Sequence, residues 1–253
     1  METQNYNYQD PNVIQLEEGR VAKKFFAQVF LWMFVALSLS AVSAYIFISN
    51  PSFISGLVSL NEAGEPTGLS GLGFAVQFAP LILVLTMSFA LSKLSYPALI
   101  ALFVGYSVTM GLSLSFLLMR YSTSSIVVCF ISAAAIFGLM AFMGYTTNVD
   151  LTKFGSLLFI GLIGLIIASV INMFMGSSTM EYILSFLGVA IFTGLTAYDV
   201  QKIKRFGQGY ELSGETELHV DAKKAGIIAA LTLYLDFINI FIYLLRIFGD
   251  RRN

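Results

Sequence analysis

The sequence predicts an all-α integral membrane protein with seven transmembrane helices. Of its 253 residues, 57% are hydrophobic and 11% are charged, whereas soluble domains have roughly 45–50% apolar and about 25% charged residues. Seven stretches are apolar over the roughly 20 residues that a helix needs to cross a hydrocarbon core about 30 Å thick. The net charge of −1 argues against a nucleic-acid-binding surface.

Turn-forming or charged residues separate the predicted spans. Pro97 and residues 123–125 and 177–179 mark tight turns. The first connection, 49–71, is long and contains prolines and glycines, and the sixth, 203–224, is the only strongly charged one. In chain order, the spans cover residues 22–48, 72–93, 97–119, 124–145, 154–175, 181–202 and 225–248.

We expect three parts along the chain: a polar, flexible tail over residues 1–20, a membrane domain over 21–249 and a short tail over 250–253. Small residues recur every four positions in two spans, and this spacing lets helices approach closely in lipid. They are Ser107, Gly111 and Ser115 in the third span, and Gly164 and Ala168 in the fifth.

Lysine and arginine residues orient the spans by the positive-inside rule. With a cytoplasmic N-terminus, the cytoplasmic side has ten of these residues and the opposite side four, namely Arg120, Arg246, Arg251 and Arg252. Three of the four are near the C-terminus. A re-entrant last segment would return them to the cytoplasm, but 225–248 is long enough to cross, so seven full spans are preferred.

Two aspartates within the apolar spans are the principal candidates for function. Asp236 is near the middle of the seventh span, where a carboxylate costs about 2.5–3.5 kcal/mol on insertion scales. Asp199 is near the cytoplasmic end of the sixth span. Acids in such positions usually serve a purpose, so these two indicate a proton-sensitive site.

Helical spacing places further polar residues beside both acids. Thr232, Asp236, Asn239 and Tyr243 are separated by four, three and four positions and share one face. Thr196 is three residues from Asp199 and shares its face. Because a polar stripe is unfavourable in lipid, we expect it to face other helices or a water-filled path.

Two carboxylates that meet inside a membrane cannot both ionise cheaply. A shared proton would join the sixth and seventh helices, and its loss would separate them or recruit a cation. Calcium prefers such oxygen ligands, so a pH-gated cation path is one hypothesis. In the structural alternative, Asp199 pairs with Lys202 or Lys204 at the interface, and Asp236 only holds helices together through hydrogen bonds.

Three segments have a recognisable sequence: GYTTNVDLTKFGSLLFIGLIGLIIASVINMF (144–174), TAYDVQKIK (196–204) and LTLYLDFINIFIYLLRIFG (231–249). They resemble the transmembrane Bax inhibitor motif family, in its bacterial branch. The resemblance implies two three-helix layers around a central C-terminal helix, and a pH-sensitive calcium leak channel in the bacterial inner membrane. Such a channel needs no cofactor. The resemblance implies that calcium is the permeant or transiently bound ion.

The resemblance also implies residue roles. Asp199 and Asp236 match the family's aspartate pair, where calcium would bind. Lys93 occupies the place of a basic residue that latches onto the pair, an arginine in the bacterial channel. Lysine lacks the planar fork of arginine, so we expect a looser latch.

Two other functions stay open. Some family members regulate a membrane protease or a stress or cell-death pathway without conducting ions. Intramembrane aspartyl proteases also have aspartates on their sixth and seventh helices, and two carboxylates sharing a proton can activate water. However, their second aspartate follows Gly-x-Gly, whereas Asp236 follows Leu233, Tyr234 and Leu235. We therefore expect no enzymatic activity.

Overall fold

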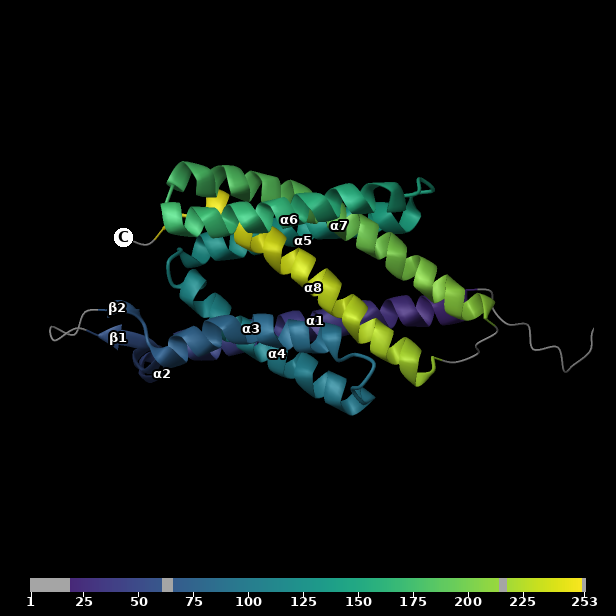
Figure 1. Cartoon of the computed structure of the whole chain (residues 1–253), viewed down its shortest axis with the longest axis horizontal. Coiled ribbons are helices and arrows are strands. Elements are labelled where there is room, and N and C mark those ends of the chain that lie inside the picture. Colours follow the sequence, from purple (N-terminus) through teal and green to yellow (C-terminus); the bar gives the residue numbers. More distant parts are fainter. Residues whose placement is uncertain (1–18, 61–65, 214–217, 252–253) are drawn as a thin grey trace, which may run out of the picture.

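Seven long apolar helices form the structure, a computed structural model that describes residues 19–60, 66–213 and 218–251 (Figure 1). Within these ranges they confirm the predicted all-α membrane class. Residues 1–18 of the expected N-terminal tail lie outside the described residues. The seven are α1 (Arg20–Ile48), α3 (Gly71–Phe89), α4 (Tyr96–Leu118), α5 (Thr123–Thr146), α6 (Thr152–Met175), α7 (Ser178–Leu212) and α8 (Val220–Phe248).

Serine residues begin several of these helices. The hydroxyls of Ser95, Ser122 and Ser177 accept hydrogen bonds from backbone N–H groups in the first turns of α4, α5 and α7. Such caps satisfy donors that have no partner within the helix. They fix the short turns that the sequence predicts.

Two connections are more ordered than the hydropathy pattern indicates. The stretch 49–71 contains a short helix, α2 (Pro51–Leu57), and an antiparallel hairpin of β1 (Val58–Leu60) and β2 (Pro66–Leu69). α7 continues ten residues beyond the predicted end of its span. A helix needs no apolar sequence outside the bilayer, and the extension is held because Gly207 packs against Ala22 of α1.

The C-terminal helix α8 contacts helices from both halves of the chain. Figure 1 shows α1, α3 and α4 on one side, α5, α6 and α7 on the other, and α8 crossing obliquely. α8 packs against α1, α4, α5 and α7, and it has the largest buried share of the seven helices. Because α1 also packs against α7, the two groups touch directly. Two separate three-helix layers therefore stay a prediction.

The end of α8 is fixed to the connection between α4 and α5. The Ser122 N–H donates to the Asp250 carbonyl at 2.9 Å, and the Asp250 N–H donates to Ser125 Oγ at 3.0 Å. α8 therefore crosses the whole bundle (Figure 1). This course is the one expected for a full last span, as the length of 225–248 predicts. We call the end of the bundle where α1 and α8 begin its N-terminal end, and the end where α4 and α8 finish its C-terminal end.

One of the two small-residue patterns marks a helix contact. A Cβ at Gly111 would overlap Ser40 and Ser43 of α1, whereas a Cβ at Gly164 would meet open space. The third-span pattern thus brings α4 against α1. The fifth-span expectation is wrong at Gly164, because that face of α6 is exposed.

Candidate functional site

The two membrane aspartates interact where α7 packs against α8. Asp199 is 9% exposed and Asp236 is 3% exposed, and the two carboxylates are within electrostatic reach of each other. The Oδ2 atom of Asp236 is buried and has no hydrogen-bond partner among the described residues. Such an unpaired oxygen costs about 1–3 kcal/mol, and more when charged. A proton shared with a second oxygen, a water molecule or a cation would lower this cost.

The lysines near Asp199 are directed elsewhere. Lys202 is within electrostatic reach of Asp199, but its Nζ lies 6.0 Å from the ring centre of Tyr198 and 5.9 Å from that of Phe206. Lys204 Nζ donates to the Tyr145 carbonyl at 2.8 Å. Neither lysine forms an ion pair with Asp199 in the described ranges. The geometry therefore does not fit the alternative of an interfacial ion pair.

Lys93 lies in the connection between α3 and α4, and its side chain is exposed. It lines a surface hollow together with residues from the last turns of α3, including Thr86 and Phe89. No ion pair joins it to either aspartate in the part of the chain that the structure describes. Its role as a latch stays a prediction.

The threonines and the asparagine of the predicted stripe are satisfied within their own helices. Thr196 donates to the Phe192 carbonyl at 2.8 Å. Thr232 and Asn239 likewise donate to carbonyls four residues earlier, at 3.1 and 2.8 Å. Both are half-buried, whereas Asp236 is fully buried. The stripe therefore leaves the Asp236 carboxylate as its unsatisfied member.

Tyr243, the last residue of the stripe, contacts α7 and α6. Its ring packs against Gly188 and lies 6.0 Å from the ring of Phe192, centre to centre. Its hydroxyl interacts with Ser169 of α6. The stripe thus faces helices, as expected for polar groups in a bilayer.

Comparison with known proteins identifies the family. A family model described as "Inhibitor of apoptosis-promoting Bax1" matches residues 22–253. The chain belongs to this family. An uncharacterized protein of Borreliella burgdorferi is 43% identical over 94% of this chain and 96% of its own length. Inner membrane protein YbhL of Escherichia coli K12 is 40% identical over 95% and 97%.

These matches confirm the predicted family and, with the seven apolar helices, an integral protein of the bacterial inner membrane. An uncharacterized membrane protein of Streptococcus pyogenes serotype M1 also matches, at 35% identity over 94% of this chain and 97% of its own. The orientation of the N-terminus stays a prediction.

This Bax inhibitor family member also has a buried hydroxyl cluster that the sequence analysis missed. Ser40 of α1 shares a 2.7 Å hydrogen bond with the Tyr234 hydroxyl of α8 and donates toward the Ser107 carbonyl of α4 at 2.7 Å. The nearby Tyr106 hydroxyl is buried without a partner in the described chain. The sequence signal that could have indicated this cluster is the group of three serines, Ser38, Ser40 and Ser43, within an apolar span.

The sequence analysis also missed Gln201, which is half a helical turn after Asp199. The Gln201 amide donates to the Val149 carbonyl at 2.8 Å and accepts from the Leu151 N–H at 2.9 Å. One turn later, Arg205 contacts Asp150 at 2.7 Å. Both residues hold the α5–α6 connection against the C-terminal third of α7.

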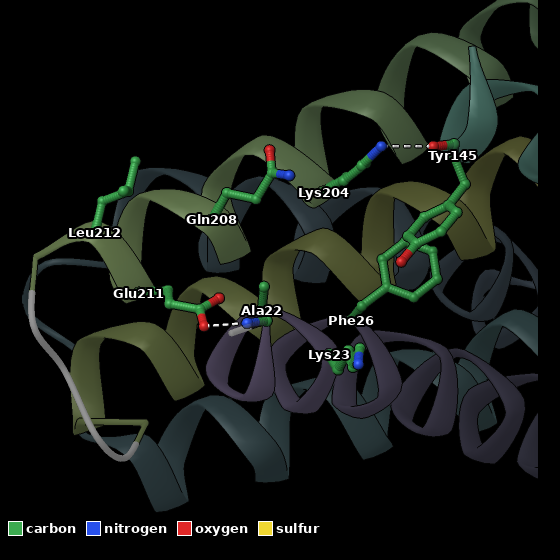
Figure 2. A pocket seen from close by; sticks show the side chains of 9 residues that line it. Ala22, Lys23, Phe26, Tyr145, Lys204, Gln208, Glu211 and Leu212 are labelled. Atoms are coloured by element: carbon green, nitrogen blue, oxygen red, sulfur yellow. Dashed lines mark hydrogen bonds between the residues drawn. The ribbon is translucent and has the colours of Figure 1, made fainter. Parts of the chain in front are cut away.

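A cavity of about 430 Å³ lies at the N-terminal end of the bundle, between α1, α5 and α7. Figure 2 shows Lys23 and Phe26 on one side and Lys204, Gln208 and Glu211 on the other. Glu211 accepts a hydrogen bond from the Gly19 N–H. Polar and aromatic groups thus line an opening beside the last turns of α7, which follow Asp199 in the sequence.

Proposed function

We propose that this protein is a cation leak channel that conducts calcium, and that protonation of Asp199 and Asp236 controls it. The observation that carries the proposal is the buried Asp236 oxygen without a donor, within electrostatic reach of a second buried carboxylate. A shared proton would neutralise this pair in one state. After proton loss, two negative charges would attract a cation or push α7 from α8.

Calcium enters this proposal as the transported ion. Calcium binds six to eight oxygen ligands, and two carboxylates supply at most four. No group of three or more His, Cys, Asp or Glu residues suitable for a metal occurs in the described ranges. Water or backbone oxygens would complete the shell, which favours transient binding during passage. Lys202 is a basic side chain within electrostatic reach of Asp199 and would limit how many cations accumulate.

Calcium flux into proteoliposomes, measured as a function of pH, tests the proposal. We expect flux that changes with pH in the unmodified protein and loses that dependence in Asp199→Asn and Asp236→Asn, because an amide does not titrate. Asp150→Asn is the matched control, since it removes a carboxylate outside the membrane spans. Unchanged pH-dependent flux in both membrane variants would refute the proposal.

A non-conducting regulator of a membrane protease or of a stress or cell-death pathway is the second candidate. The extension of α7 beyond its apolar part and the family's description as an inhibitor favour it. Crosslinking from the exposed Gln208 should then recover a membrane partner. That partner's activity should respond equally to the unmodified protein and to the Asp199→Asn, Asp236→Asn double variant.

A further inference from the structure

Three arginines line one cavity of about 450 Å³ at the C-terminal end of the bundle. Arg120 comes from the connection between α4 and α5, Arg246 from the last turn of α8, and Arg251 from the segment after α8. The acid in the lining is Glu181, in the first turn of α7. The cavity therefore has an excess of positive charge.

Within the described ranges, two of the three arginines have no carboxylate partner. Glu181 contacts Arg251 at 3.6 Å, whereas no carboxylate is within 4 Å of Arg120 or Arg246 among the residues described. The Arg246 guanidinium instead lies 5.7 Å from the Tyr243 ring centre. Guanidinium groups at one cavity repel one another, so an anion between them would stabilise the arrangement.

The backbone around the cavity is already fixed. Tyr121, which is buried, forms an antiparallel bridge with Arg251. The Ser122 N–H donates to the Asp250 carbonyl at 2.9 Å. Because these contacts hold the segments of Arg120 and Arg251 together, less ordering is needed when a ligand binds.

We propose that this cavity binds a phosphate group through Arg120, Arg246 and Arg251. The planar guanidinium offers paired donors that match phosphate oxygens. The cavity lies where the apolar helices α4 and α8 end, and Leu117 and Met119 add apolar lining. The ends of helices that span the hydrocarbon core lie near the lipid headgroups. An anionic phospholipid or a soluble phosphate supplies the same group. This site requires no ion conduction, so its failure would leave the proposed channel untouched.

Thermal unfolding of the full-length protein in neutral detergent tests the site and separates the two sources. We expect phosphatidylglycerol to raise the Tm, with a shift that grows with the logarithm of its concentration above the Kd, and phosphatidylcholine to leave it unchanged. A rise with inorganic phosphate alone would also support the site and would identify a soluble source. No rise with either phosphatidylglycerol or inorganic phosphate would overturn the proposal.

Substitutions locate the binding. Arg120→Gln changes an exposed side chain and should weaken binding about tenfold, the loss expected for one charge-assisted hydrogen bond. Arg246→Gln should do the same, and Arg246→Lys should retain part of the affinity. Arg20→Gln, at the opposite end, is the matched control. Equal weakening by Arg20→Gln and Arg120→Gln, or full affinity in Arg120→Gln, would refute a site at this cavity.

Discussion

Tyr234 of α8 and Ser40 of α1 share a 2.7 Å hydrogen bond between their hydroxyls inside the bundle. Tyr234→Phe removes this bond and keeps the ring. We expect it to lower the free energy of unfolding by about 1 kcal/mol, because buried hydrogen bonds in membrane bundles contribute amounts of this order. Unfolding by denaturant in mixed micelles measures the change.

Tyr106→Phe is the control for this prediction. The Tyr106 ring lies 5.5 Å from that of Tyr234, centre to centre, but its buried hydroxyl has no partner in the described chain. We expect its removal to leave stability unchanged or to raise it. Equal destabilisation by the two substitutions would show that the Ser40 contact contributes nothing specific.

The sequence predicts the fold well because a bilayer leaves few alternatives. Each buried backbone group must be satisfied within its helix, so apolar length alone locates the spans. Hydropathy does not predict where helices end in water. That is why the extension of α7 to Leu212 and the hairpin of β1 and β2 were missed.

The site is only partly predictable for a related reason. The high cost of a carboxylate in lipid singles out Asp236 and Asp199, and helix spacing groups their polar neighbours. The pairing of Ser40 with Tyr234 depends on how α1 and α8 cross, which no local pattern encodes. Gln201 was missed because its partners are backbone groups 50 and 52 residues away.

The close approach of α4 to α1 depends on Gly111. A Cβ there would overlap Ser40 and Ser43, so Gly111→Ala should lower the free energy of unfolding by about 1–3 kcal/mol through overpacking. Gly164→Ala meets open space and should gain up to about 1 kcal/mol of helix propensity. Denaturant unfolding of both variants provides the comparison, and a stabilised Gly111→Ala would contradict the packing.

Gln201 should control the opening of the α5–α6 connection. Gln201→Ala leaves the Val149 carbonyl and the Leu151 N–H without the partner that now binds both, and water would replace it. We expect faster hydrogen exchange at Leu151, measured by mass spectrometry on the 147–152 segment. The exposed Gln208→Ala is the control and should leave exchange there unchanged. Protection of Leu151 retained in Gln201→Ala would refute the role of these two hydrogen bonds.

Asp150, between α5 and α6, should titrate unusually low. Hydrogen bonds from the Thr152 hydroxyl, from Arg205 and from the Thr152 N–H lower its pKa from 3.8 to about 2. A carboxyl whose pKa is lower in the folded protein stabilises folding above its unfolded pKa, near 3.8, and loses this contribution as the pH falls toward 2.

Thr152→Val and Arg205→Gln should therefore each raise the pKa of Asp150 toward 3.8, with the larger rise for Thr152→Val, as measured by carboxyl carbon NMR. Lys202→Gln removes another cation of α7, one that does not contact Asp150, and should leave the titration in place. An unaltered pKa in both of the first two variants would mean that these contacts do not hold the connection in solution.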